Sequence, residues 1–250
     1  MVSKIVFVAL CSVLLVPALA APSSRIVGGW EAEENQFPYE ILLRYFGIPY
    51  CGGSIISENY VLTAAHCVVT GSRLNPAGGY RVLAGSNSLS KRGVMVNVSK
   101  IIVHENYKDE SLFNDIALLE LTEPLKFDDS VKAIEVYEDE VPEGSNITIS
   151  GWGRIYDGGL ISKQLKFNIL TAISQEECNK KIGMNYAGLI CLGHRRDNGA
   201  CNGDSGGPAT YQGKLVGVAN FVHKSKCGTQ YPDAYAKVSY FNKWIKNNTS

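Results

Sequence analysis

The sequence predicts an all-β protein that ends in a single α-helix, and two observations carry this prediction. Short apolar runs recur from residue 52 to residue 222, and Gly, Pro, Asn and Asp separate them, which is typical of antiparallel strands joined by turns. The only clear helical period lies at the C-terminus. No repeat, low-complexity segment or obvious linker interrupts this pattern. It fits a β-sandwich or β-barrels.

The expected elements follow in chain order. The strands are GGSII at 52–56, YRVLAG at 80–85, VMVNVSKIIVH at 94–104, DIALLEL at 115–121, NITISGWG at 146–153, KFNILTAIS at 166–174 and KLVGVANFV at 214–222. The helix is expected over 235–248, where Val238, Phe241, Trp244 and Ile245 share one face.

Residues 1–20 have the pattern of a secretory signal peptide. Lys4 precedes an apolar run at 5–15, and Ala18-Leu19-Ala20 gives the small-residue spacing that a signal peptidase needs. A membrane anchor is the alternative, but the run is too short to cross about 30 Å of hydrocarbon, and no later run is long enough. We therefore expect a secreted, extracellular protein without a membrane span.

Charge is balanced along the rest of the chain. The whole sequence has 24 basic and 24 acidic residues, and 22 basic residues remain without Lys4 and Arg25. No basic face and no interleaving of aromatic and basic residues indicates nucleic-acid binding. About 230 residues after the signal peptide are enough to bury a sizeable core in one or two domains.

The cysteine count indicates disulfides. Of seven cysteines, Cys11 leaves with the signal peptide, and the six that remain are Cys51, Cys67, Cys178, Cys191, Cys201 and Cys227. An even number in an oxidising compartment implies three disulfides, although six cysteines allow about 15 pairings. A zinc site is the alternative, but CxxC pairs are lacking and the four histidines are scattered, so no metal is expected.

Three side chains could together activate a nucleophile. A hydroxyl becomes a useful nucleophile only when a base takes its proton and a third group holds that base in place. The sequence offers Ser205 in GDSGG, His66 in TAAHC and Asp115 in NDIALLEL. Each residue alone is weak evidence for catalysis, since such a histidine is most often packed in the core and such an aspartate most often belongs to a turn. Their order along the chain is one of the known orders of a Ser-His-Asp triad.

The motifs around these residues resemble those of the chymotrypsin-like serine endopeptidases, which include trypsins and elastases. They are RIVGG at 25–29, TAAHC at 63–67, NDIALLEL at 114–121, SGWG at 150–153 and GDSGGP at 203–208. The resemblance covers nearly all of the chain after the first motif. It implies two six-stranded antiparallel β-barrels packed face to face, a triad in the cleft between them and a C-terminal α-helix.

The resemblance also implies a role for each residue of the site. Ser205 would attack the peptide carbonyl, His66 would accept and later return its proton, and Asp115 would orient the imidazole. The backbone N–H groups of Gly203 and Ser205 would bind the developing oxyanion, and a side chain at position 203 would obstruct that approach.

By the same resemblance, the chain is a zymogen. Residues 21–25 would be an activation peptide and residues 26–250 the protease domain. A trypsin-like protease would cut after Arg25 and free the α-ammonium of Ile26, which would pair with Asp204 and set the oxyanion loop.

The family's disulfide pairing would join Cys51–Cys67, Cys178–Cys191 and Cys201–Cys227. Each disulfide closes a short loop, and a stabilisation of about 2–4 kcal/mol is usual for such a bond.

Substrate selection in this family depends on a pocket for the side chain before the cut bond. The matching residues are Gly199, Ala200, Asn202, Asn220, Phe221, Val222 and Asp233. Trypsins have an aspartate where this chain has Gly199, so ordinary trypsin-like activity is not expected. Asn220 replaces a serine that usually assists the triad aspartate.

Two of these residues predict different substrates. Val222 replaces a common glycine and would narrow the mouth, as in elastase-like members, which favours small or medium aliphatic side chains. Asp233 replaces a second glycine and resembles certain broad-specificity invertebrate collagenolytic enzymes, in which a relocated acid can attract Lys or Arg. Steric exclusion acts on every large side chain, whereas neighbouring N–H groups or water can satisfy the acid. We therefore favour the narrow pocket.

Three functions from different classes fit these motifs to different degrees. The first is a digestive endopeptidase, since the activation peptide is minimal and no accessory module precedes it. The second is a regulatory protease of an immune or clotting-type cascade. The third is a binding protein of protease shape without activity, which the complete triad disfavours. The expected partners are polypeptide substrates, an activating protease and protein inhibitors, and a monomer is expected.

Remaining features are minor. Glycosylation sequons occur at Asn97, Asn146, Asn247 and Asn248. No cofactor is expected, and the region that binds calcium in trypsins, here 81–103, contains no Asp or Glu. His104, His194 and His223 have no motif around them and are expected at the surface.

Overall fold

The computed structural model describes residues 26–90 and 93–249. The predicted signal peptide (1–20), the predicted activation peptide (21–25) and Arg25 lie outside these residues.

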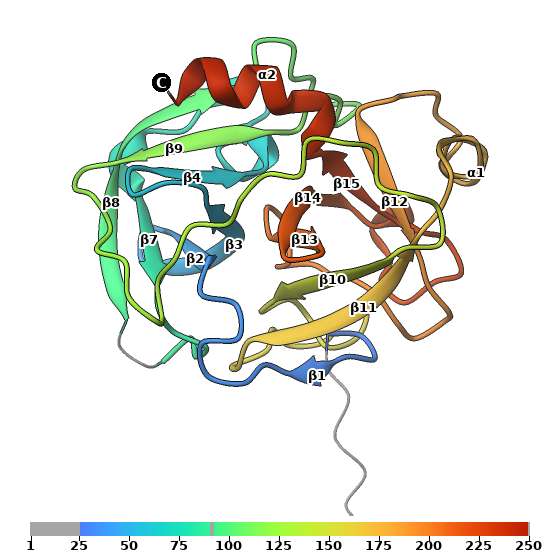
Figure 1. The fold of residues 1–250 in the computed structure, drawn as a ribbon, viewed down its shortest axis with the longest axis horizontal. Coiled ribbons are helices and arrows are strands. Elements are labelled where there is room, and N and C mark those ends of the chain that lie inside the picture. Colours follow the sequence, from blue (N-terminus) through green and yellow to red (C-terminus); the bar gives the residue numbers. More distant parts are fainter. Residues whose placement is uncertain (1–25, 91–92, 250) are drawn as a thin grey trace, which may run out of the picture.

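The first half of the chain forms a closed six-stranded antiparallel barrel. Its strands pair in the order β2-β3-β4-β9-β8-β7 and occupy the left of Figure 1. They are β2 (Glu40–Tyr45), β3 (Ile48–Ile55), β4 (Tyr60–Thr63), β7 (Tyr80–Ala84), β8 (Val94–Val103) and β9 (Ala117–Leu121). A short hairpin of β5 (Val69–Thr70) and β6 (Arg73–Leu74) follows the 3-10 turn Ala65–Cys67. A second 3-10 turn, Ala77–Gly79, leads into β7.

The second half forms a second antiparallel barrel. It closes because β11 pairs with β10 at one edge and with β12 at the other, which makes six strands in the ring. The strands are β10 (Asn146–Gly151), β11 (Lys166–Ala172), β12 (Leu189–Gly193), β13 (Pro208–Tyr211), β14 (Lys214–Phe221) and β15 (Asp233–Lys237). The short β1 (Trp30–Glu31) adds to β11 from outside. A third 3-10 turn, His223–Ser225, follows β14. The predicted fold class is confirmed.

Each barrel has its own apolar core. Ile41, Leu43, Val61 and Leu118 are among the fully buried side chains of the first barrel, and Ile147, Leu192 and Val216 are in the second. Along β8, the buried Val96 and Val98 alternate with the exposed Met95 and Asn97, the two-residue period of a strand with one face inside. Closure removes the strand edges that would otherwise expose unpaired backbone groups.

Two α-helices accompany the barrels. α2 (Val238–Asn248) lies across the first barrel in Figure 1, and its buried Val238, Phe241 and Ile245 belong to that barrel's core. The expected start at 235 is corrected, because 235–237 pair with β14 and complete β15. The other helix, α1 (Gln175–Ile182), is not among the elements that the sequence predicts.

The ends of α1 explain why so short a helix forms. Ser174 Oγ accepts a hydrogen bond from Glu177 N at the start. Gly183 ends the helix with a left-handed φ of 73°. The sequence pattern Ser-x-x-Glu is a capping-box signal and could have found this helix.

The three implied disulfides are present. Their Cα–Cα separations are 6.2 Å for Cys51–Cys67, 5.5 Å for Cys178–Cys191 and 5.1 Å for Cys201–Cys227, all within the normal range.

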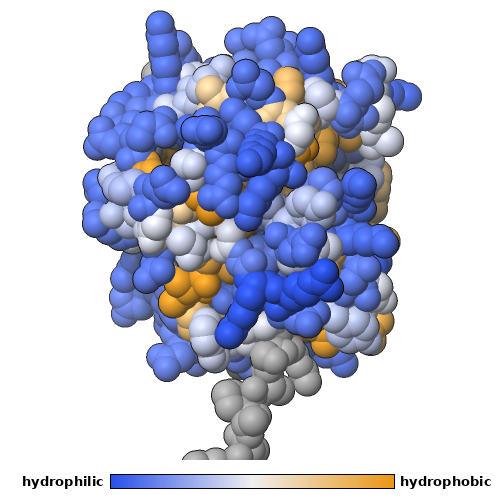
Figure 2. All heavy atoms as spheres, turned by 90° about the vertical axis from the view of Figure 1, so that its right-hand side faces the viewer, coloured by the Kyte–Doolittle hydropathy of each residue, from blue (hydrophilic) through white to orange (hydrophobic). Residues whose placement is uncertain are grey.

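The face in Figure 2 is mostly hydrophilic, with separate small apolar areas. Among the residues that the structure describes, no helix is both long enough and apolar enough to cross a membrane.

Candidate active site

His66 and Asp115 form a pair on the first barrel. His66 lies in the 3-10 turn after β4, and Asp115 precedes β9, which pairs with β4. The Nδ1 atom of His66 lies 2.7 Å from Asp115 Oδ2, and the backbone N–H of His66 donates to Asp115 Oδ1 at 2.8 Å. The two contacts hold the imidazole by both its ring and its backbone. Because a carboxylate only accepts, Nδ1 carries the proton and Nε2 is left as the base.

Opposing effects act on the pKa of His66. Burial lowers this pKa, but the charge of Asp115 and its hydrogen bond, with a smaller contribution from Asp109, outweigh burial and raise the pKa above 6.5. The imidazolium is therefore stabilised, which suits a base that must hold a proton during a reaction.

Ser205 comes from the second barrel, on the tight loop between Cys201 and β13. Its carbonyl accepts a hydrogen bond from Gly52 N at 2.7 Å, which joins the loop to the first barrel. The disulfide Cys51–Cys67 ties the same part of β3 to the turn of His66. No hydrogen bond joins Ser205 Oγ to His66 within 26–90 and 93–249, a contact that is often long when substrate is absent.

Gly206 shows how closely the two barrels meet beside the serine. A Cβ at this position would overlap Thr63 Oγ1 and would lie 3.2 Å from Ala64 N, just before His66. The φ of Gly206 is 77°, a value that favours glycine. This close approach brings the Ser205 loop against the His66 segment.

Two backbone donors of the loop remain available. Across the described ranges, the N–H groups of Gly203 and Ser205 donate to no protein acceptor, whereas those of Asp204, Gly206 and Gly207 do. Gly203 has a φ of 102°, and a Cβ there would lie 3.2 Å from Gly153 Cα. The backbone at 203 therefore depends on glycine, and the two N–H groups are free to bind an anion.

The side chain of Asp204 is buried next to the serine loop. Its carboxylate accepts from Gly153 N at 2.7 Å and from Cys201 N at 2.9 Å. Burial raises the pKa of Asp204 to about 7, although these two donors oppose the rise. A buried carboxylate is costly when its negative charge has no cationic partner, so a cation beside Asp204 would stabilise it.

The segment that begins at Ile26 is inserted nearby. Ile26 is buried in the same core as Ala200, and Val27 O accepts from Gly199 N at 3.0 Å. The φ of Ile26 is 43°, a strained conformation for a β-branched residue.

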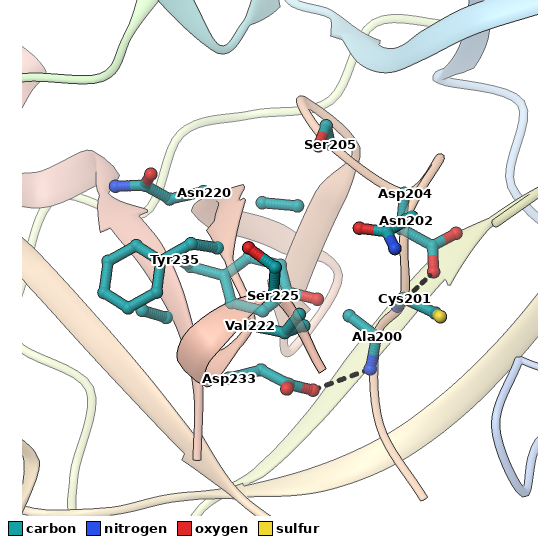
Figure 3. A pocket seen from close by; sticks show the side chains of 13 residues that line it. Ala200, Cys201, Asn202, Asp204, Ser205, Asn220, Val222, Ser225, Asp233 and Tyr235 are labelled. Carbon is teal, nitrogen blue, oxygen red and sulfur yellow. Dashed lines mark hydrogen bonds between the residues drawn. The ribbon is translucent and has the colours of Figure 1, made fainter. Parts of the chain in front are cut away.

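A cavity of about 90 Å³ opens beside Ser205 (Figure 3). Six of the seven residues that the resemblance assigns to the pocket line this cavity, namely Ala200, Asn202, Asn220, Phe221, Val222 and Asp233. Gly199 does not line it, although it lies next to the carboxylate of Asp233. The cavity is also lined by four residues that the sequence motifs do not indicate, Ala219, Ser225, Ala234 and Tyr235.

Asp233 forms the floor, at the end of the cavity away from Ser205 (Figure 3). Its Oδ2 accepts from Ala200 N at 2.6 Å, and its Oδ1 lies 3.3 Å from His194 Nε2. A Cβ at Gly199 would overlap Asp233 Oδ2 and lie 2.8 Å from His194 Nε2. An aspartate at 199 would therefore collide with the acid that is already present.

The expected surface position of His194 is wrong. Its side chain is only 1% exposed, because β12 pairs with β15 and carries His194 to the side of Asp233. No sequence motif surrounds His194, so only the strand pairing reveals this contact.

Asn220 lies at a bulge of β14, where the register with β15 shifts. Its side-chain amide donates to Leu112 O at 3.1 Å, and Asp115 is not its partner. The bulge turns Asn220 toward the segment just before the aspartate.

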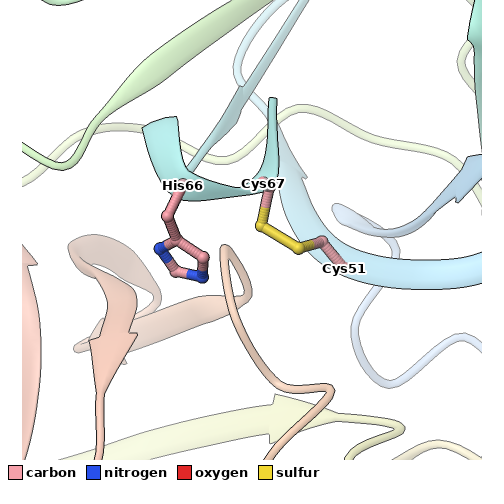
Figure 4. A group of neighbouring side chains, drawn as sticks. All are labelled: Cys51, His66 and Cys67. Atoms are coloured by element: carbon pink, nitrogen blue, oxygen red, sulfur yellow. A yellow bond between two sulfur atoms is a disulfide. The ribbon is translucent and has the colours of Figure 1, made fainter. Parts of the chain in front are cut away.

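His66 also lies close to two sulfur atoms, those of Cys51 and Cys67 (Figure 4). The two sulfurs form a disulfide and so do not offer the thiolates that bind a metal.

Comparisons with known proteins agree with this arrangement. The Trypsin family profile matches residues 26–245. Serine protease SP24D of Anopheles gambiae is 46% identical over 223 residues, which cover 89% of this chain and 80% of that protein. Brachyurin of Leptuca pugilator is 34% identical over 228 residues, which cover 90% of this chain and 98% of that protein. Trypsin zeta of Drosophila melanogaster is 37% identical over 246 residues, or 90% and 86% of the two chains. The chain therefore belongs to the trypsin family of chymotrypsin-like serine endopeptidases.

Proposed function

We propose that this protein is a secreted endopeptidase that hydrolyses peptide bonds through a Ser205-His66-Asp115 triad. The observation that carries the proposal is the bonded His66–Asp115 pair packed against a serine loop with two available N–H donors. Ser205 Oγ attacks the carbonyl carbon and passes its proton to His66, while the N–H groups of Gly203 and Ser205 hold the oxyanion. His66 then protonates the leaving amine. Water hydrolyses the acyl-enzyme by the same route.

The site is proposed to become active only after cleavage. Cutting after Arg25 turns Ile26 N into an ammonium, which supplies the cation that buried Asp204 calls for. It also removes the strained φ of Ile26, since this torsion requires the preceding carbonyl. The pairing would hold the loop from Cys201 to Ser205 in place. The protease domain would then be 26–250.

The first prediction concerns pH. As pH falls through the raised pKa of His66, the imidazole is protonated and kcat/KM is lost, so the acid limb is expected above pH 6.5. At the alkaline side, an α-ammonium has a pKa of about 7.7–8.0, which a carboxylate partner raises. Activity is therefore retained below the raised value and is lost above it. A pH profile of kcat/KM tests this, and Asp115→Asn removes the charge that raises the His66 pKa. An acid limb below pH 6 would contradict the role of the pair.

The pocket is proposed to select small or medium aliphatic side chains. Its volume is small, Val222 lines it, and both oxygens of Asp233 face protein groups. A branched side chain at the mouth blocks an aromatic ring, and relieving such a clash costs about 1–3 kcal/mol.

The second prediction follows from this pocket. The kcat/KM for peptides with Ala, Val or Leu before the cut bond should be higher than for peptides with Phe, Tyr, Lys or Arg there. Val222→Gly should raise the rate for Phe and Tyr roughly tenfold to hundredfold. Val222→Thr keeps the bulk and should keep the exclusion, which makes it the matched control. Asp233→Gly should leave the ranking among neutral side chains almost unchanged.

The main alternative is that Asp233 governs the pocket and attracts Lys or Arg. Best cleavage after Lys or Arg, with loss of that preference in Asp233→Gly, would establish it and overturn the aliphatic pocket. A regulatory cascade protease remains the alternative to a digestive one.

Secretion and protein partners belong to the same proposal. An activating trypsin-like protease and protein inhibitors would act on this chain. Three sequon asparagines are exposed for glycans, Asn97, Asn146 and Asn247.

The experiment that tests the function is hydrolysis of a peptide library by the protein cut after Arg25. Cleavage that an organophosphate abolishes supports the proposal and also gives the substrate ranking. A correctly cut, folded protein that cleaves nothing would leave the binding-protein alternative.

A further inference from the structure

The floor of the pocket contains a histidine that the proposed mechanism does not use. His194 extends from the end of β12, where Leu192 pairs with Asp233 of β15. The side chains of His194 and Asp233 are 1% and 4% exposed, and His194 Nε2 lies 3.3 Å from Asp233 Oδ1. An acid and a base therefore lie together at the buried end of the pocket.

The hydrogen bonds of His194 show where its protons lie. Its Nδ1 lies 2.9 Å from the carbonyl oxygen of Arg195, and a carbonyl can only accept, so Nδ1 carries a proton. In a neutral imidazole, Nε2 would then present a lone pair to the carboxylate. The 3.3 Å contact is an ion pair rather than an aligned hydrogen bond, and Nε2 has no hydrogen-bond partner among the described residues. Two acceptors facing each other repel, so the contact is favourable only when a further proton lies on Nε2 or Oδ1.

The groups around the pair support retention of that proton. Burial lowers the pKa of His194, but the close contact and charge of Asp233 and the Arg195 carbonyl raise it overall, while Lys181 on α1 opposes the rise. Burial also raises the pKa of Asp233, against the effects of His194 and Ala200 N. Both directions favour a proton on the pair.

Two further titratable groups lie on the other sides of Asp233. Asp204, on the serine loop, has its pKa raised in part by the charge of Asp233. Tyr235, the next inward residue of β15, is fully buried, and burial followed by the charge of Asp233 raises its pKa. Neither group supplies a positive charge. Among these neighbours, His194 alone can neutralise the floor by direct contact.

We propose that His194 is a specificity-determining residue, which neutralises Asp233 by sharing a proton with it and thereby makes the pocket favour uncharged side chains. The proposal rests on the proposed endopeptidase function. Loss of the shared proton leaves the floor with one negative charge, which attracts a lysine or arginine side chain of the substrate. The preference between Lys and Leu before the cut bond is thus a function of pH.

The test uses a ratio of rates. The quantity is kcat/KM for a peptide with Lys before the cut, divided by kcat/KM for the same peptide with Leu there. Protonation of His66, or loss of the Ile26 ammonium, changes both rates by the same factor and cancels. The ratio therefore reports the pocket alone. In the wild-type protein cut after Arg25, it is expected to rise about tenfold or more from pH 6 to pH 9.5 as the floor becomes charged.

Three variants sharpen the test. His194→Gln can donate to Asp233 but cannot hold the shared proton, so the rise of the ratio should move to lower pH than in the wild type. Asp233→Asn has no charge to expose, so its ratio should be low and flat, and adding His194→Gln to it should change nothing. His104→Gln should behave as the wild type, because the His104 ring packs against Trp244 of α2 and lines no part of the cavity beside Ser205.

The outcomes separate this inference from the function itself. A flat wild-type ratio, or a His194→Gln protein with the wild-type ratio and pH dependence, would overturn the role of His194. If His194→Gln does not fold, the wild-type profile and Asp233→Asn still decide. Absence of all hydrolysis and of an organophosphate adduct in the wild type would refute the endopeptidase function instead.

Discussion

Replacing Ser205 by alanine is expected to lower kcat by about a million-fold while leaving the fold intact, because a triad acts as one unit and its nucleophile has no substitute. The loop itself should not move, since its main contacts are made by backbone groups and by the carboxylate of Asp204. Peptide hydrolysis and circular dichroism of the cut protein measure the two effects.

The control for this variant removes a hydroxyl outside the site. Ser130 is suitable, because its Oγ donates to the exposed Asp128 and lines no part of the cavity beside Ser205. Ser130→Ala should retain full activity. A Ser205→Ala protein that keeps even a hundredth of the wild-type kcat would show that another group attacks the substrate.

The second large effect is expected at the activation site. Arg25→Gln should leave the chain uncut by trypsin and with little activity, because Asp204 then lacks its proposed cation. Breaking a buried ion pair costs about 3–5 kcal/mol, which corresponds to a loss of roughly 10²–10³-fold or more in the active population. Arg25→Lys remains a trypsin site and is the matched control, expected to activate as the wild type does.

Asp204→Asn tests the same ion pair by removing the carboxylate in place of the ammonium. It should be cut normally after Arg25 and yet stay nearly inactive, since its amide cannot balance the Ile26 ammonium. Full activity of the uncut Arg25→Gln protein, or of the cut Asp204→Asn protein, would show that the Ile26–Asp204 ion pair is not needed for activity. N-terminal sequencing confirms which form is measured.

The sequence predicts those parts of the fold that long apolar runs encode. All seven expected strands overlap strands of the structure, and α2 follows from its apolar face. The sequence pattern does not reveal β2, because its first residue, Glu40, is a buried acid that bonds Ser150. It does not reveal β15 either, because Asp233 and Lys237 interrupt the apolar pattern, and Asp233 faces the pocket.

The sequence likewise predicts some residues of the site and not others. His66, Asp115 and Ser205 lie in motifs, so their roles can be expected from the sequence. The contact of His194 with Asp233 depends on the register of β12 against β15, which the local sequence does not specify. The sequence assigns Gly199 to the pocket, but Gly199 does not line the cavity, and its closeness to Asp233 is evident only in the structure.

The central claim is that Ser205 is the activated nucleophile of a site that cleavage after Arg25 completes. The most direct measurement is mass spectrometry of the protein treated with an organophosphate before and after cutting by trypsin. The account predicts a single adduct on Ser205 in the cut protein, formed at least about a hundredfold faster than in the uncut chain, and none in the Ser205→Ala variant. An adduct on another residue, or none on the cut and folded protein, would contradict it.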